Sequence, residues 1–151
     1  VVIHTNTSHG PTYFKKYPSE FEEFTPVCTT VEMSKANHQE LMNAYDNSVI
    51  YTDWLIHSVI ETLKEIPEVR SCMMYVSDHG ESLGENNLYM HGVPMSIAPR
   101  EQIEIPFIVW TSDSTLRIKE EEATQYHVFH SVMDFLGVES PIFDETRNIF
   151  E

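Results

Sequence analysis

Basic residues and long apolar runs are both scarce in this chain of 151 residues. Only 9 lysines and arginines stand against 24 aspartates and glutamates, which gives a formal net charge of −15. Such acidity argues against a nucleic-acid partner, because phosphate backbones are bound through clustered positive charge. It does not exclude an anionic substrate held by a metal ion, since the ion dominates its local field. No apolar run approaches the roughly 20 residues of a membrane-spanning helix.

Cysteines are also few, and repeats and low-complexity stretches are absent. Cys72 falls in a run that reads as a buried strand, where a free thiol is common, so the cysteines alone decide little. Hydrophobic residues make up 41% of the chain, which predicts one modest globular domain with a real core. The chain opens on the strand-like run Val1–Ile3 without the basic segment of a secretory leader. We therefore expect a fragment of a longer domain.

Hydrophobic periodicity predicts three strands and two helices in this sequence. Asn37 and Glu40 form a capping-box pattern at the start of the first helix, and Pro67 follows its end. Its regularly spaced apolar residues predict a face that covers a sheet. Because the order is strand, helix, strand, strand, helix, we predict an α/β fold with helices flanking the sheet. The expected strands are residues 1–5, 72–76 and 103–110, and the expected helices are residues 37–66 and 115–136, the second with an acidic first turn at residues 120–122 and a stop at Gly137.

One short stretch concentrates the chemistry of the chain. Asp78 and His79 stand side by side where the strand of residues 72–76 must end, and Gly80 follows them. Glycine permits backbone conformations that let two adjacent side chains converge, and strand ends are common ligand sites in α/β sheets. A carboxylate and an imidazole together suit a zinc-like divalent cation. An ordinary surface turn with an acidic residue and a hydrogen-bonded histidine is an equally good interpretation of this spacing alone.

Two further polar loops carry histidines, His9 and His91. If the fold brings these loops to the sheet edge of Asp78 and His79, the two imidazoles are candidates for binding a second metal or an anionic group, or for protonating a leaving group. For His9 by itself, a loop histidine hydrogen-bonded to backbone is the more common case. A catalytic zinc site generally needs three protein ligands, and no serine or threonine stands in an evident nucleophile setting. The chain therefore reads as half of an active site.

These residues belong to a longer set of motifs that resembles a known family. The chain is similar to the C-terminal half of the catalytic domain of bacterial phosphoethanolamine transferases, the lipid A modifying and mobile colistin resistance enzymes of the alkaline phosphatase and sulfatase superfamily. The similarity runs in order along nearly the whole chain. It is carried by residues 8–13, 16–18, 24–26, 28, 45–48, 51–53, 77–84, 89, 91–92 and 98–99.

The resemblance implies roles for individual residues. It implies that Asp78 and His79 bind the catalytic zinc, while His9 and His91 lie beside it and bind the phosphoryl group or a second zinc. It implies that Glu81 lines the same site. It also implies a threonine nucleophile and an acidic zinc ligand in an N-terminal half, and an earlier membrane anchor, none of which this sequence contains. The family often pairs the cysteine matching Cys28 with one shortly downstream, and residues 32–37 hold no cysteine here.

The expected function follows from the resemblance. We expect zinc-dependent transfer of phosphoethanolamine from phosphatidylethanolamine to lipid A or another envelope glycan. The enzyme would sit at the bacterial inner membrane with its catalytic domain in the periplasm, and this chain alone would be inactive. The alternatives are a sulfatase or phosphodiesterase of the same superfamily, or a non-catalytic fragment.

Overall fold

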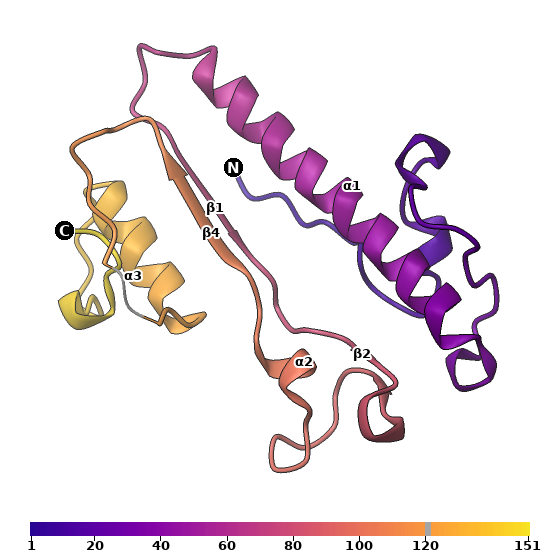
Figure 1. Ribbon diagram of the computed structural model, residues 1–151. Coiled ribbons are helices and arrows are strands. Elements are labelled where there is room, and N and C mark those ends of the chain that lie inside the picture. The colour runs from indigo at the N-terminus through magenta and orange to yellow at the C-terminus, as the bar shows by residue number, and fades with distance from the viewer. Residues whose placement is uncertain (120–121) are drawn as a thin grey trace. The chain divides into compact units, whose positions relative to one another are not determined.

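The computed structural model describes residues 1–119 and 122–151. The chain forms two compact units, and Figure 1 labels its helices and strands. The first unit comprises Val1–Ser58 and His79–Ile105, and the second comprises Val59–Asp78 and Pro106–Glu151. Within the described ranges, no helix combines the length and the apolar character that crossing a membrane requires. Helices and strands are both present, and the α/β class is as predicted.

The long helix α1, His38–Lys64, begins where the sequence predicts. The side-chain oxygen of Asn37 accepts hydrogen bonds from the backbone N–H groups of Gln39 at 2.9 Å and Glu40 at 3.3 Å. These two bonds satisfy N–H groups that have no partner inside the helix, which is the usual role of an N-cap asparagine. The helix ends shortly before Pro67, also as predicted.

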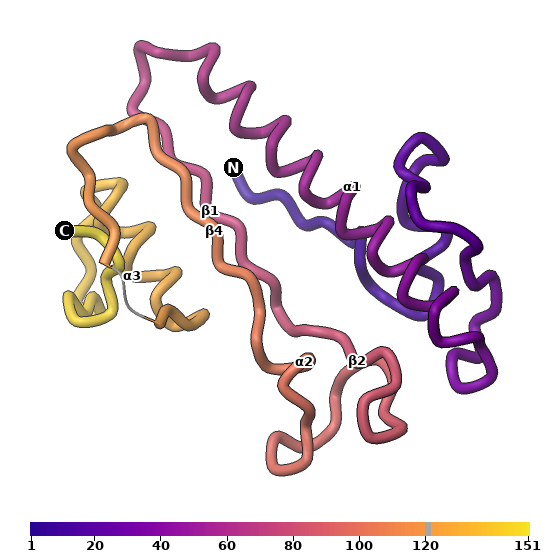
Figure 2. The backbone as a smooth tube through the Cα atoms, viewed as in Figure 1, coloured from indigo at the N-terminus to yellow at the C-terminus, as the bar shows by residue number. Residues whose placement is uncertain are grey.

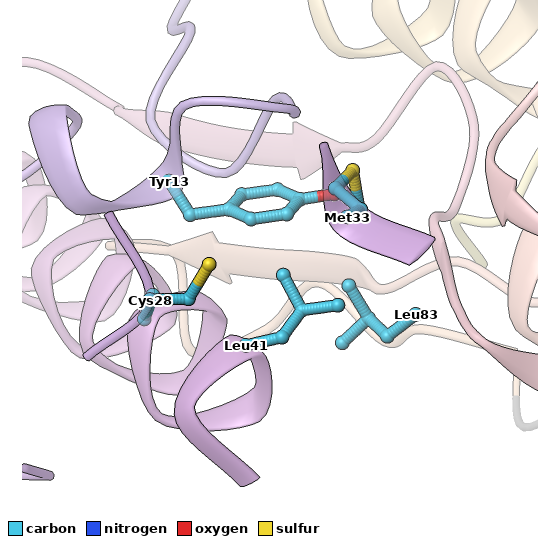
Figure 3. Close-up of a cluster of buried hydrophobic side chains, with 6 residues drawn as sticks. Tyr13, Cys28, Met33, Leu41 and Leu83 are labelled. Carbon is cyan, nitrogen blue, oxygen red and sulfur yellow. The ribbon is translucent and has the colours of Figure 1, made fainter. Parts of the chain in front are cut away.

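The buried face of α1 is more polar than the sequence pattern indicates. Leu41 and Ala44 are buried beside Asn47 and Ser48, whereas Val49, predicted to face the core, is 42% exposed. The physical reason is the nature of the partner: α1 packs mainly on an irregular N-terminal segment whose backbone polar groups need side-chain hydrogen bonds. The predicted packing of this helix face on a sheet stays a prediction, because most of α1 and the strands β1 (Cys72–Val76) and β4 (Phe107–Thr111) belong to different units. Figure 3 shows part of the cluster, which comprises Tyr13, Cys28, Met33, Leu41, Ala44 and Leu83.

Asn47 makes the most extensive of these polar contacts. Its side chain is fully buried, its oxygen accepts from the backbone N–H of Phe24 at 2.9 Å, and its amide donates to the carbonyl of Phe24 at 2.9 Å. The same amide also donates to the hydroxyl of Tyr17 at 3.3 Å. One side chain thus reproduces the paired bonds that a neighbouring strand would supply.

The N-terminal residues do not form the predicted strand. Val1, Val2 and Ile3 are exposed at 122%, 97% and 67% of their reference areas. A strand requires a hydrogen-bonded neighbour, and within the part of the chain that the structure describes no segment pairs with these residues. Thr7 and Ser8, which follow, bond to α1 through their hydroxyl groups instead. Figure 2 shows the N-terminal segment running beside this helix.

The loop between His79 and Ile105 contains short regular elements. Strand β2, Ser82–Leu83, pairs antiparallel with β3, Tyr89–Met90, and the helix α2, Arg100–Ile103, follows. Part of the predicted strand from Ile103 is therefore helical. The side-chain amide of Gln102 donates to the buried hydroxyl of Ser82 at 2.8 Å, which ties the two ends of the loop together.

The second unit contains an antiparallel ladder. Strand β1, Cys72–Val76, has the predicted bounds and pairs with β4, Phe107–Thr111, in a register that places Met74 opposite Val109. Strand β4 starts directly after Pro106, as expected for a residue that has no N–H to donate. Of β1, only Met73 is buried, so the strand is less enclosed than predicted.

The C-terminal helix is shorter than predicted. Helix α3 spans Tyr126–Phe135 and ends before Gly137, whose φ of +63° makes it the predicted stop. Residues before it pair with the tail of the chain: Ile118 bridges Phe150, and the N–H of Lys119 donates to the carbonyl of Ile149 at 2.8 Å. This pairing competes with helix formation from Thr115. Two residues of the predicted acidic first turn, 120–121, lie outside the described residues.

We predict that replacing Asn47 by alanine lowers the free energy of unfolding by about 2–3 kcal/mol, because it removes the hydrogen bonds that a fully buried side chain makes to Tyr17 and to the backbone of Phe24. Urea unfolding followed by circular dichroism measures the change. The matched control is Gln39→Ala, since the exposed amide of Gln39 bonds to Asn43 at 2.9 Å on the same helix. The control should change stability by less than about 0.5 kcal/mol; equal effects from both variants would contradict the prediction.

Candidate functional site

Three histidines from distant parts of the sequence meet in the first unit. One ligand atom from each of His9, His79 and His91 lies within 4.8 Å of the others. The ring centroids of His79 and His91 are 3.6 Å apart in a stacked arrangement, and those of His9 and His91 are 5.3 Å apart. The prediction that the loops of His9 and His91 converge on His79 is confirmed.

Hydrogen bonds at the Nδ1 atoms orient all three rings. Nδ1 of His9 lies 2.6 Å from the carbonyl oxygen of Gly10, and Nδ1 of His79 lies 2.9 Å from that of Gly80. Nδ1 of His91 lies 2.7 Å from Oε1 of Glu81. Carbonyl and carboxylate oxygens accept hydrogen bonds, so each Nδ1 donates its proton. In a neutral imidazole the lone pair is then on Nε2, the atom that binds a metal or an electrophile.

Glu81 connects one of these rings to the core. Glu81 directly precedes β2 in the chain, and its side chain is 5% exposed. While Oε1 accepts from His91, Oε2 accepts from the hydroxyl of Tyr13 at 2.5 Å. Burial, followed by the hydrogen bond to the Glu81 carboxylate and its charge, raises the pKa of the Tyr13 hydroxyl far above its ordinary value. Tyr13 therefore remains protonated and keeps donating to Glu81.

The His9 loop is fixed to α1 by hydroxyl groups. Thr52 Oγ1 lies 2.5 Å from Thr7 Oγ1 and 3.2 Å from Ser8 Oγ. The hydroxyl of Ser48 lies 3.1 Å from that of Ser8, and both helix residues are buried. These contacts position the backbone of His9, because Ser8 directly precedes it in the chain.

Close backbone approach explains the glycine after His79. A Cβ atom at Gly80 would lie 2.0 Å from the carbonyl oxygen of Glu101, and the Gly80 N–H donates to the carbonyl of Gln102 at 3.1 Å. Any side chain would force these two backbones apart. From the sequence, Gly80 was expected to provide conformational freedom. In the structure, the reason for a glycine here is the close contact with the backbone of Glu101.

Asp78 lies at the end of the second unit, one peptide bond before His79. Its carbonyl oxygen accepts from the side-chain amide of Gln125 at 2.6 Å, and the same amide donates to the carbonyl of Ser77 at 2.9 Å. Burial and, to a smaller extent, the negative charge of Asp78 raise the pKa of the Tyr75 hydroxyl. Gln125 thus fixes the backbone at the point where the chain passes from one unit to the next.

Sequence reasoning did not assign Tyr13 and Gly10 to the site. The structure brings both against Glu81: besides the hydrogen bond from Tyr13, a Cβ atom at Gly10 would lie 3.2 Å from Glu81 Oε2. The sequence feature that could have identified them is the stretch of residues 8–13, which contains both residues together with His9. Among the described residues, His57 is exposed on α1, and both Cys28 and Cys72 are free thiols.

The donor set fits a zinc ion. Imidazole nitrogen and carboxylate oxygen are typical zinc ligands, and the three imidazoles here present nitrogen atoms close together. Each ring also has the hydrogen-bonded second nitrogen that usually accompanies metal-binding histidines. This arrangement also suits a phosphoryl group, whose oxygen atoms are hydrogen-bonded by protonated imidazole.

Comparison with known proteins places this site in a family. A family model described as sulfatase matches residues 1–138. The chain belongs to the sulfatase family. Among sulfatase-family relatives it is 35% identical to phosphoethanolamine transferase EptA of Escherichia coli K12 over 164 aligned residues, covering 100% of the chain and 30% of that protein. It is also 47% identical to phosphatidylethanolamine transferase Mcr-1 of Escherichia coli, over 76% of the chain and 21% of that protein.

Solved structures of this family show the same fold. The C-terminal periplasmic domain of phosphoethanolamine transferase EptC from Campylobacter jejuni matches 95% of the chain and 48% of its own length, with a TM-score of 0.88 and 41% identity. The integral membrane protein lipooligosaccharide phosphoethanolamine transferase A from Neisseria meningitidis matches with a TM-score of 0.90 and 38% identity, over 97% of the chain and 30% of that protein. The chain thus spans less than a third of the length of the curated relatives that it matches.

We predict that Thr52→Val loosens the His9 loop, because the isosteric change removes the hydroxyl that contacts both Thr7 and Ser8. Amide hydrogen exchange at Thr7, Ser8 and His9 should accelerate roughly fivefold, the equivalent of about 1 kcal/mol. Ser58→Ala is the matched control, since it removes a hydroxyl that donates to the Trp54 carbonyl at 2.8 Å within the same helix. Unchanged exchange at these three amides in Thr52→Val would show that the hydroxyl contacts do not hold the loop.

Proposed function

We propose that this chain forms part of the active site of a zinc-dependent phosphoethanolamine transferase. The donor is phosphatidylethanolamine, and the acceptor is lipid A or another cell-envelope glycan. The convergence of His9, His79 and His91 is the single observation that carries the proposal. It is supported by similarity to curated relatives that are named phosphoethanolamine transferases, one of them a Kdo(2)-lipid A phosphoethanolamine 7''-transferase of Escherichia coli K12 at 34% identity.

We assign the metal to the neighbouring residues Asp78 and His79. Their adjacency in the chain and the nitrogen that His79 presents to the cluster support this assignment. Zinc at this position supplies positive charge that polarises a phosphoryl oxygen. His9 and His91 then either hold a second zinc or hydrogen-bond the phosphoryl oxygens.

The protein groups around the metal have separate tasks in this proposal. His9 and His91 present Nε2 to the phosphoryl group, and a protonated imidazole there stabilises negative charge on oxygen. Glu81 holds Nδ1 of His91 at 2.7 Å, which keeps its ring from turning. The net charge of −15 repels an anionic substrate at long range, so the local positive charge of the metal and imidazoles has to provide the attraction.

The proposed location is the periplasmic face of the bacterial inner membrane. The relative from Neisseria meningitidis is described as an integral membrane protein, and the Campylobacter jejuni structure as a periplasmic domain. By analogy the phosphoryl site would face the periplasm, where a lipid donor and a glycan acceptor are both accessible.

We predict that Asp78→Ala and His79→Ala each weaken zinc binding by more than about 100-fold, which exceeds the usual effect of losing an outer-shell partner. Competition with a zinc-binding dye and elemental analysis of the intact protein measure affinity and content. His57→Ala is the matched control, because His57 is an exposed histidine on α1. Full zinc occupancy in both site variants would rule out this metal assignment.

The transfer reaction itself can be tested with the intact protein, fluorescent phosphatidylethanolamine and lipid A. We expect lipid A to gain one phosphoethanolamine mass, and we expect His79→Ala to abolish this gain while His57→Ala preserves it. Release of sulfate from an aryl sulfate without any transfer would support the sulfatase alternative. Absence of transfer to lipid A and to core glycans, at full zinc occupancy, would contradict the proposed function.

A further inference from the structure

The carboxylate of Glu81 joins two hydrogen-bond donors from opposite sides. Oε1 accepts from Nδ1 of His91 at 2.7 Å, and Oε2 accepts from the hydroxyl of Tyr13 at 2.5 Å. The Glu81 side chain is 5% exposed, so water contributes little to fixing it. Since a carboxylate rotates easily about its last bond, the direction in which Oε1 points depends on what holds Oε2.

The position of the Tyr13 hydroxyl is fixed by packing of its ring. Tyr13 is 1% exposed and belongs to the buried cluster with Cys28 and Leu41 (Figure 3). The ring of Tyr45 meets it edge to face, with centroids 5.4 Å apart and an interplanar angle of 90°. A ring held on several sides cannot move its hydroxyl without disturbing the core.

Gly10 makes room for this contact. A Cβ atom at that position would lie 2.6 Å from the oxygen of Tyr13 and 3.2 Å from Oε2 of Glu81. The carbonyl of the same residue lies 2.6 Å from Nδ1 of His9. The backbone at Gly10 therefore touches both the Tyr13–Glu81 pair and the loop histidine, and a larger residue would push the hydroxyl and the carboxylate apart.

We propose that Tyr13 is a positioning residue that orients the imidazole of His91 through Glu81. The hydroxyl of Tyr13 holds Oε2, the carboxylate then directs Oε1 at Nδ1 of His91, and the ring of His91 lies in the cluster with His9 and His79. The proposal rests on the proposed function only for what Nε2 of His91 does there. The geometry of the chain Tyr13, Glu81, His91 stands independently of the reaction.

Two properties separate this role from simple core packing. Tyr13→Phe retains the buried ring and removes the hydroxyl alone, so the packing of the cluster is preserved. A purely structural hydroxyl would lower stability without changing the protonation pattern of one distant ring. Removing a positioning hydroxyl changes the tautomer of the His91 ring, and it does so only while Glu81 is present.

The test uses the metal-free intact protein with nitrogen-15-labelled histidine. In the wild type, NMR at fixed pH should show His91 with its proton on Nδ1. In Tyr13→Phe we expect a mixture of Nδ1-H and Nε2-H tautomers, and about a 10-fold lower kcat in the zinc-loaded enzyme with KM little changed. Tyr17→Phe is the matched control, because Tyr17 is another buried tyrosine whose hydroxyl donates to a glutamate, Glu22, at 3.3 Å; it should leave the His91 tautomer and kcat unchanged.

Glu81→Gln provides the second variant. Glutamine offers one accepting oxygen where the two donors require two, so it should shift the His91 tautomer by itself. Adding Tyr13→Phe to Glu81→Gln should then cause little further change, since the hydroxyl acts through the carboxylate. Fully additive effects on the tautomer, or an unchanged His91 spectrum in Tyr13→Phe, would overturn the proposal.

The two proposals fail in distinguishable ways. A tautomer shift in Tyr13→Phe together with no transferase activity in the wild type would retain the positioning role and reject the proposed function. Wild-type transfer activity with an unaltered His91 ring in Tyr13→Phe would do the reverse. Thermal melting of every variant checks folding, and a variant that does not fold is replaced by the Glu81→Gln comparison, which tests the same link from its other end.

Discussion

The first unit depends on polar side chains of α1 that replace a neighbouring strand. The N-terminal segment crosses this helix without regular backbone pairing, and buried side-chain amides of the helix bond to its backbone groups instead. Asn47 satisfies both backbone groups of Phe24, and Asn43 donates to the carbonyl of Pro26 at 2.8 Å. Each such bond avoids the cost of leaving a buried asparagine amide unpaired, which is larger than the net gain of an ordinary hydrogen bond. The same principle explains why a helix in an α/β protein has so polar a buried face.

The site inherits its geometry from this arrangement. His9 follows residues held by Ser48 and Thr52, and Tyr13 enters the core next to Leu41. One segment therefore delivers both a ring that faces the cluster and a hydroxyl that supports another ring. Because Ser48 and Thr52 of α1 make the contacts that hold this segment, substitutions of these two residues are expected to affect the site although they contact none of its histidines.

Sequence patterns predicted the elements whose signals are local. The cap at Asn37, the bounds of β1 and the stop at Gly137 each depend on residues within one turn or strand, and all three are confirmed. Patterns failed where a distant partner decides the outcome. Residues 1–5 lack a neighbour to pair with in the described chain, and the segment around Ile118 pairs with the tail near Phe150, which no local propensity reveals. The convergence of His9, His79 and His91 was predicted from their loops, whereas Tyr13 was not assigned to the site, because its hydroxyl partner lies 68 positions away.

All three clustered histidines are followed by glycine, yet they do not depend on the fold to the same degree. For His9 and His79, the acceptor for Nδ1 is the carbonyl of the very next residue, so ring orientation is encoded within a dipeptide. For His91 the acceptor belongs to a residue ten positions earlier that is itself anchored in the core. Partial opening of the core would therefore release the third imidazole while the local preferences of the other two persist. All three imidazoles are therefore in place only when the core of the surrounding unit is packed. An intact cluster indicates that this core has its native packing.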